Sequence, residues 1–313
     1  MFRAFQNSSS SFTDRIYTRP DLSGIGSLVT ASTAAAVSLL LDTYPDAIVA
    51  YSTRKLRTAY TGSALRVRRS SDNTEQDIGF TATNDLDESA LTTFVGANDG
   101  FVVRWYNQAS SSYSSSILQS TTANQATIVS SGTVTKINSK PTLDFDTTDF
   151  YTSNEILIKN TTHANVFSVH QYKNVNTDIY AVYDLAPSVG FGLTVDSRSS
   201  PAFMKLWTGG LAGNVTTYNF QPAANTTYLT SNIQNPSTSS NTAGPIWVNN
   251  VQYTSSAYSI FGQEDIIPYS LGSLNNFSSV LNGRLSEFIF YPTDQSANRV
   301  GIQDNINAYY SIY

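Results

Sequence analysis

Phe101-Val102-Val103-Arg104-Trp105-Tyr106 is the stretch that decides the fold of this 313-residue chain. Its aromatic and β-branched side chains fit a pleated, half-buried backbone, so the stretch predicts a β-strand. Residues 65–68 and 141–145 alternate along the chain with the period of two that a strand with one buried face requires. Further strands are expected at residues 47–51, 166–171, 179–183, 190–195, 203–207, 227–232, 246–251 and 285–291. Many short strands between polar turns predict an all-β sandwich or jelly roll.

Two segments before residue 100 are expected to be helical instead. Residues 32–41 combine helix-forming Ala and Leu with a Ser-Thr start, which predicts a short helix that ends at Tyr44-Pro45. Residues 87–94 open with Asp87 and Glu88, and acidic side chains stabilise the first turn of a helix.

The C-terminal residues predict a closing helix. Val300, Ile302 and Ile306 recur near helical spacing, and Tyr309 or Tyr310 continues the pattern. Thr293-Asp294 precedes them as a candidate N-cap region. We therefore expect an amphipathic helix that packs against the sheet.

The N-terminal residues differ from the rest of the chain. Residues 8–11 form a serine run, and Arg19-Pro20 favours extended backbone. We expect residues 1–46 to form an N-terminal arm and residues 47–313 to form the sandwich. Two interpretations of the arm stay open: an extension packed on its own domain, or a segment that docks onto another subunit.

The composition excludes several classes of protein. The chain has no cysteine, which removes thiol nucleophiles, thiolate zinc sites and disulfide scaffolds. Charged residues make up 13% of the chain and the net charge is −5, which argues against nucleic-acid binding. No apolar run reaches the roughly 18 residues that a membrane span needs. The first residues lack the apolar region of a secretory signal.

Several passages resemble one family. They are Tyr51-Ser52-Thr53-Arg54-Lys55-Leu56-Arg57 with Tyr60-Thr61-Gly62, Leu65-Arg66-Val67-Arg68-Arg69, residues 101–108, Thr122-Ala123-Asn124-Gln125-Ala126, Lys140-Pro141-Thr142-Leu143-Asp144-Phe145 and Ser286-Glu287-Phe288-Ile289-Phe290-Tyr291. Together they resemble the concanavalin-like sandwich of the fungal α-L-arabinofuranosidase catalytic domain, to which modules of bacterial and phage surface proteins are related. The resemblance covers about residues 47–313 and implies a concanavalin-like jelly-roll β-sandwich with a short C-terminal helix.

The resemblance also implies where catalytic carboxylates should stand. A retaining glycosidase needs two of them, about 5 Å apart. The family's nucleophile is a Glu in an Asp-x-Glu-Asn segment, and the closest segment here places Asp196 at the first position and Arg198 at the nucleophile. The family's acid/base is an Asp after two glycines, where Leu274 stands in this chain. Arginine stays protonated and cannot act as a nucleophile. We therefore expect no catalytic residues in this chain.

The family's sugar pocket has adjacent cysteines before a Phe-Asp pair. Here Ala181-Val182 precede Tyr183-Asp184. The nearby acids Asp184, Asp196, Glu264 and Asp265 keep a shifted alignment open. The candidate ligand-binding residues are therefore Asp184, Asp196, Arg198 and Trp207. Trp207 is a candidate for stacking on a sugar because Thr208-Gly209-Gly210 follows it, whereas Trp105 is expected in the core.

The histidines and the acid-rich turns give weaker evidence for a functional site. His163 and His170 are the only histidines, and His170 lies in an alternating stretch typical of an ordinary strand histidine. The acid-rich turns Asp144-Phe145-Asp146 and Glu264-Asp265 could bind calcium, or they could be solvated loop acids.

Basic residues concentrate between Arg54 and Arg69. Two interpretations are open: a patch for an acidic partner, or a solvent face balanced by Asp72, Glu75 and Asp77. We favour the second.

Three functions remain open at this stage. The preferred one is a non-enzymatic structural protein of a phage particle, a head fibre, tail or decoration component. It would sit on the virion surface as a homo-oligomer, with residues 1–46 binding other virion proteins and the sandwich facing cell-surface polysaccharide. The second is a free-standing, extracellular lectin-like module. The third is an active arabinofuranosidase-like glycoside hydrolase with displaced carboxylates.

Overall fold

The computed structural model describes residues 38–110, 116–157, 163–176, 178–185, 191–198, 200–208, 215–234, 244–254, 268–274 and 279–313. All of them belong to one compact unit, Ser38–Tyr313. The helices are α1 (Leu40–Thr43), α2 (Glu88–Val95) and α3 (Arg299–Tyr310), with one 3-10 turn at Thr122–Asn124.

Antiparallel strands make up most of the unit. They are β1 (Val49–Ser52), β2 (Leu65–Arg69), β3 (Glu75–Ile78), β4 (Gly100–Trp105), β5 (Ile117–Leu118), β6 (Thr127–Ser130), β7 (Thr133–Val134), β8 (Lys136–Ile137), β9 (Lys140–Pro141), β10 (Leu143–Phe145), β11 (Tyr151–Thr152), β12 (Ala164–Tyr172), β13 (Ile179–Asp184), β14 (Phe191–Asp196), β15 (Phe203–Thr208), β16 (Val215–Thr217), β17 (Thr227–Gln234), β18 (Ile246–Val248), β19 (Val251–Tyr253), β20 (Ser270–Leu271) and β21 (Gly283–Tyr291).

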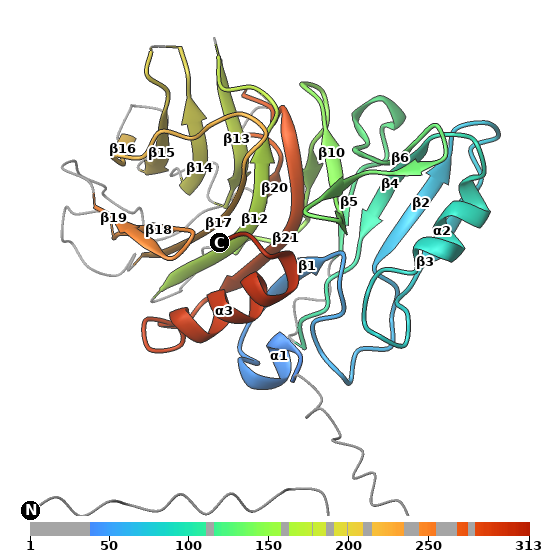
Figure 1. The fold of residues 1–313 in the computed structure, drawn as a ribbon, viewed down its shortest axis with the longest axis horizontal. Coiled ribbons are helices and arrows are strands. Elements are labelled where there is room, and N and C mark those ends of the chain that lie inside the picture. The colour runs from blue at the N-terminus through green and yellow to red at the C-terminus, as the bar shows by residue number, and fades with distance from the viewer. Residues whose placement is uncertain are drawn as a thin grey trace, which may run out of the picture. The chain divides into compact units, whose positions relative to one another are not determined.

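In the described part of the chain, nineteen strands form one continuous hydrogen-bonded sheet, and β8 pairs with β9 apart from it (Figure 1). The large sheet has two parts, which we call sheet A and sheet B. Sheet A runs in the order β3-β2-β4-β5-β11-β20-β13-β14-β15-β16. Sheet B runs β7-β6-β10-β21-β12-β17-β18-β19, and β1 pairs with β21. The sheets join where β4 pairs with both β5 and β6. The all-β sandwich that the sequence predicts is therefore confirmed.

The main core lies between the two sheets. Val67 and Trp105 of sheet A share one hydrophobic cluster with Val166 and Phe288 of sheet B, and all four are at most 1% exposed. Trp105 packs against Tyr51 with ring centroids 5.8 Å apart. The sequence placed Trp105 in the core, and the structure confirms it.

Helix α3 covers the outer face of sheet B. Ile302, Ile306 and Tyr310 are fully buried against Phe167 and Val169 of β12. Burial of side chains of this size contributes about 1.5–3 kcal/mol each. The predicted closing helix is confirmed, although Val300 remains 46% exposed.

The predicted start of this helix was wrong. The residue at the N-cap position of α3 is Asn298, not Thr293 or Asp294, and its side chain makes no capping hydrogen bond. Asp294 instead accepts hydrogen bonds from the backbone N–H and hydroxyl of Ser296. It therefore stabilises a turn before the helix.

The packed unit starts before the predicted boundary at residue 47. Leu40 and Leu41 of α1 are buried, and the Leu41 N–H donates to the Leu56 carbonyl at 2.8 Å. The Tyr291 hydroxyl donates to the Tyr44 carbonyl at 3.0 Å. The larger unit accordingly begins at Ser38. Of the helix expected at 32–41, residues up to 37 lie outside the described part.

One strand prediction differs from the structure, and several short strands were not predicted. Residues 246–251 form the hairpin β18–β19, because Asn249 and Asn250 both adopt positive φ and close a two-residue turn. Strand β3 was not predicted, since its Glu-Gln-Asp sequence lacks strand character and its first three residues are exposed. It forms the edge of sheet A, where polar side chains face solvent.

Candidate functional site

A β-bulge in β13 sets the direction of Asp184. The pairing register of β13 with β14 shifts between Ala181 and Tyr183. Consecutive strand residues normally face opposite sides of a sheet, but here both Val182 and Tyr183 are buried in the core. The residue after the bulge, Asp184, consequently lies on the outer face of sheet A with its pairing partner Gly192. The bulge includes Ala181-Val182, which stand where the resemblance places the adjacent cysteines of the family.

Asp184 belongs to a row of residues that crosses sheet A. Residues directly opposite each other in neighbouring strands share a face, and the pairings connect one residue per strand. From β2 to β15 the row reads Arg66, Arg104, Leu118, Thr152, Ser270, Asp184, Gly192 and Trp207. We call these residues the outer row. It is predominantly polar, and it contains two of the four predicted site residues, Asp184 and Trp207.

The outer row is exposed at one end and covered toward the other. Leu118 is 37% exposed, whereas Ser270 and Asp184 are 4% and 3% exposed. Burial strengthens hydrogen bonds to Asp184, because water competes less for its oxygens.

The other two candidates form a separate cluster. Arg198 donates to both carboxylate oxygens of Asp196, at 3.0 and 2.9 Å, and Lys205 donates to one of them at 2.8 Å. Asp196 is 5% exposed. These hydrogen bonds, first those from Arg198, hold the pKa of Asp196 well below its usual range. Asp196 therefore stays ionised and paired, which does not suit a general acid.

Asp184 and Asp196 are too far apart to act as a glycosidase pair. Asp184 pairs with Gly192, and Asp196 lies four residues further along the same strand, β14. Four residues of strand span about 13 Å. Retaining enzymes need about 5 Å between carboxyl groups, and inverting enzymes about 6.5–9.5 Å.

Leu274 covers the outer row at Gly192. A Cβ atom at Gly192 would lie 2.6 Å from Cδ2 of Leu274, so the leucine side chain fills the space that a side chain there would need. Leu274 is the residue that the resemblance places at the acid/base position. The structure thus brings Leu274 close to Gly192 and Asp184, where it supplies apolar surface.

The described part of the chain gives no support for calcium at Asp144 or Asp146. Asp144 forms ion pairs with Lys173 and Arg284. Asp146 accepts hydrogen bonds from the N–H and hydroxyl of Thr148. Among the described residues, no group of three or more His, Asp or Glu side chains could hold a metal ion. The alternative candidates, Glu264 and Asp265, lie outside them.

Asp149, close to this turn, gives a pH-dependent prediction. Burial raises its pKa to about 6, although the Asp146 N–H donates to it at 2.9 Å. Because the folded pKa lies above the ordinary value, Asp149 lowers the free energy of unfolding as pH rises from about 4 to about 6. We expect Asp149→Asn to be more stabilising at pH 7 than at pH 4, by about 2–3 kcal/mol. Urea unfolding at both pH values measures this difference. Equal effects at the two pH values would contradict it.

His170 is an ordinary buried strand residue, as expected. It is fully buried in β12, and burial lowers its pKa to about 3. Its Nδ1 lies 3.2 Å from the hydroxyl of Ser168.

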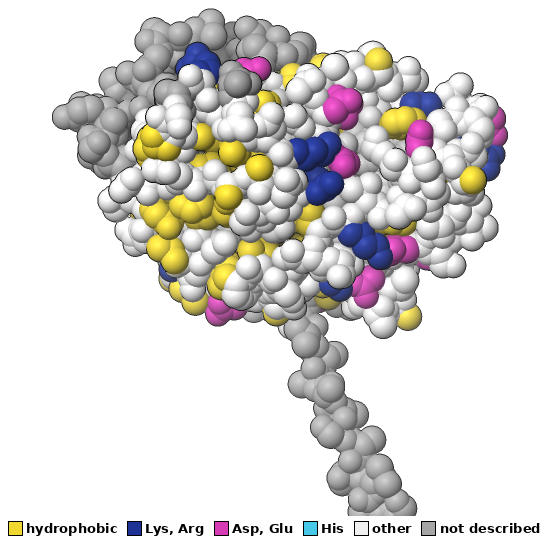
Figure 2. Space-filling view, turned by 45° about the horizontal axis from the view of Figure 1, so that its top comes forward, with side chains coloured by type: hydrophobic (Ala, Val, Ile, Leu, Met, Phe, Trp, Pro, Cys, Tyr) yellow, Lys and Arg dark blue, Asp and Glu magenta, His cyan; other side chains and the backbone are white. Residues whose placement is uncertain are grey.

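The basic stretch forms ion pairs, as the preferred interpretation predicted. Arg66 pairs with Asp77 at 2.8 Å, and Arg69 pairs with Asp72 at 2.6 Å. Figure 2 shows the same pattern on one face, where Lys and Arg side chains lie beside Asp and Glu on a largely uncharged surface. Arg54 is different, because it is 5% exposed and pairs with Glu287 inside the protein.

Sequence reasoning missed Thr152 and Ser270 in the outer row. Both lie in two-residue strands, which leave no periodic signal in a sequence. Ser270 and Asp184 are 86 residues apart in the sequence and are opposite each other in paired strands, so only the fold brings them together.

Comparison with known proteins agrees with the fold. A solved arabinofuranosidase complexed with arabinofuranosyl-α-1,2-xylobiose has a TM-score of 0.55 and 16% identity, covering 86% of this chain and 64% of that one. A GH54 α-L-arabinofuranosidase soaked with a cyclic sulfate inhibitor has a TM-score of 0.55 and 16% identity, covering 84% and 62%. The chain thus spans less than two-thirds of the length of these enzymes.

At this identity the likeness shows the fold alone, and it confirms the concanavalin-like sandwich. No protein family and no curated protein matches the sequence. Within the described residues, no helix is both long and apolar enough to cross a membrane.

Proposed function

We propose that this chain is a non-enzymatic, glycan-binding sandwich on the surface of a phage particle, as a head fibre, tail or decoration component. The observation that carries the glycan-binding part is the outer row, with Asp184 next to Ser270. Carboxyl, hydroxyl and guanidinium groups along one row suit the hydroxyls of a sugar, which both donate and accept hydrogen bonds.

The arrangement of the acids supports a role without hydrolysis. Asp196 is paired with two cations and lies about 13 Å along the strand from the position opposite Asp184. Leu274 adds no ionisable group near Asp184.

The location on a virion is a separate part of this proposal. It rests on the surface chemistry, which is rich in hydroxyl and amide groups and poor in charge. In this arrangement the N-terminal residues bind other virion proteins and the sheet A face meets polysaccharide.

Glycan-array binding and hydrolysis of 4-nitrophenyl α-L-arabinofuranoside test the function together. We expect binding to at least one oligosaccharide and no hydrolysis above the uncatalysed rate. Asp184→Asn should weaken binding about 10-fold, because it changes a hydrogen-bond acceptor of the outer row. Asp304→Asn is the matched control, since Asp304 is exposed on α3.

Two results would overturn parts of the proposal. Hydrolysis that is lost in Asp184→Asn would show an enzyme with displaced carboxylates. A monomer in light scattering would contradict attachment as a virion oligomer.

A further inference from the structure

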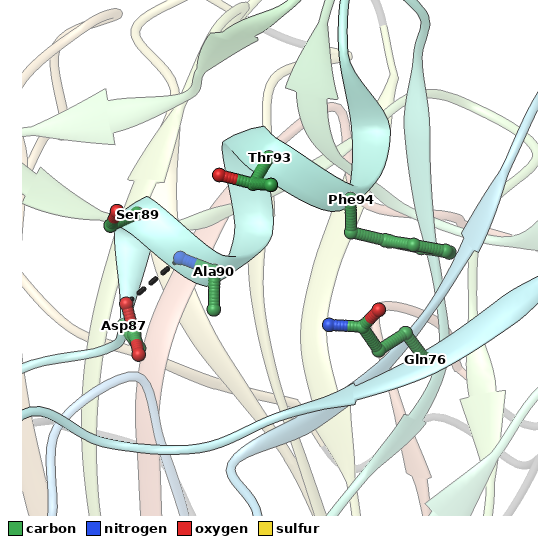
Figure 3. A pocket seen from close by; sticks show the side chains of 6 residues that line it. All are labelled: Gln76, Asp87, Ser89, Ala90, Thr93 and Phe94. Carbon is green, nitrogen blue, oxygen red and sulfur yellow. Dashed lines mark hydrogen bonds between the residues drawn. The ribbon is translucent and has the colours of Figure 1, made fainter.

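We propose that a groove along α2 is a second glycan subsite, and that it selects neutral sugars. It lies at the edge of sheet A, where α2 follows β3. The larger part of the groove has a volume of about 650 Å³ and is lined by Gln76, Asp87, Ser89, Ala90, Thr93 and Phe94 (Figure 3). Ligand pockets typically measure about 300–1,000 Å³, so the groove has room for one or two sugar rings.

The groove offers polar atoms that the protein itself does not use. Among the described residues, the side chains of Gln76, Ser89 and Thr93 make no hydrogen bond or ion pair. Gln76 supplies both donors and an acceptor, which match neighbouring hydroxyls of a sugar. Figure 3 shows the Gln76 side chain extending from its strand below Phe94, with Ser89 and Thr93 on the helix.

Asp87 is held in place by the start of α2. One of its oxygens accepts from the Ala90 N–H at 2.9 Å, which caps the helix. The second oxygen can accept a hydrogen bond from a ligand. A side chain that is already fixed loses little conformational entropy on binding, so Asp87 is preorganised.

Phe94 adds apolar surface to the groove. It is half-buried and packs against the main core. Arg69 lies over its ring at 5.1 Å, which leaves the remaining ring surface for the groove. The apolar C–H groups of a sugar ring can pack there while its hydroxyls meet Gln76 and Asp87.

A second, adjoining cavity extends the groove. Its volume is about 350 Å³, and it shares Asp87 and Ser89 with the first. Its other lining residues include Thr81, Thr83 and Ser139, all with hydroxyl side chains. Two cavities with a common wall predict that affinity rises with the number of sugar units.

The charges of the groove favour a neutral ligand. Asp85 pairs with Lys140 at 3.2 Å, and Glu88 pairs with Lys136 at 2.8 Å. Asp87 has no cationic partner among the described residues. A uronic acid or other anionic sugar would therefore meet an uncompensated negative charge.

The test begins with an array of neutral and uronic-acid oligosaccharides and continues with calorimetry of the strongest neutral binder. Gln76→Ala should weaken binding by about 3–10-fold, the effect of one or two lost hydrogen bonds. Ser89→Trp should abolish binding in the groove, because an exposed indole would fill it. Gln252→Ala is the matched control, since Gln252 is also an exposed glutamine on an edge strand.

The outcomes separate this inference from the proposed function. Weaker binding in the groove variants, with Gln252→Ala unchanged, would support it, as would a stoichiometry of two that falls to one in Ser89→Trp. Binding that depends on Asp184 but not on Gln76 or Ser89 would overturn the groove and leave the outer row. A preference for uronic-acid probes would overturn the neutral class. Binding of no oligosaccharide would overturn both proposals.

Discussion

Arg54→Met is expected to lower the free energy of unfolding by about 3–5 kcal/mol, because it leaves Glu287 as an unpaired buried charge. Glu287 is 0% exposed. The Arg54 guanidinium donates to both of its oxygens, at 2.8 and 3.0 Å, and to Asn305 of α3 at 2.9 Å. The hydroxyls of Ser52 and Tyr310 also donate to Glu287. One carboxylate thus connects β1, β21 and α3.

Urea unfolding measures the loss, and a thermal melt should show a decrease in Tm of roughly 10 °C. The double variant Arg54→Met with Glu287→Leu is the control. It should recover most of the stability, since replacing a buried ion pair by apolar residues is often neutral. A loss below about 1 kcal/mol in Arg54→Met would contradict the assignment of a paired buried charge.

Gly283→Ala is expected to destabilise the protein by about 3 kcal/mol, because β21 and β12 cannot accommodate one more carbon at this point. Gly283 pairs with Tyr172 of β12 and with Phe145 of β10. A Cβ atom here would lie inside the contact distance of the Gln171 carbonyl oxygen. The clash is with backbone, so relief requires the strands to move apart.

Gly79→Ala is the matched control for this substitution. A Cβ atom at Gly79 meets nothing within 4 Å. Its effect should stay within about 0.5 kcal/mol. Urea unfolding of both variants makes the comparison. Equal losses would show that the penalty comes from removing glycine in general and not from the β21–β12 contact.

Local sequence patterns predicted most elements of the fold. Strand β4 and helix α2 form within one residue of the predicted positions, and helix α3 forms as predicted except at its start, because each signal lies within one segment. Strand β3 was not predicted because its sequence carries no strand signal. An edge strand needs no apolar face, so its sequence resembles that of a loop.

The structure separates the four candidate ligand-binding residues into two groups. Asp184 and Trp207 do share one row of sheet A, whereas Asp196 and Arg198 form an ion pair elsewhere on the same face. The bulge at Val182 decides this, because it changes which residues of β13 face outward. A bulge of one residue cannot be recognised from the alternation of apolar and polar residues along a strand.

The sequence by itself determined that this chain is an all-β protein with Trp105 in its core and an amphipathic helix at its end. Those features depend on side-chain type and spacing along one stretch of chain. The tertiary structure alone decided that Arg54 is buried with Glu287, that Ser270 stands beside Asp184, and that α2 and β3 enclose a groove. The first two depend on pairing between strands far apart in the chain, and the third depends on how α2 packs beside β3.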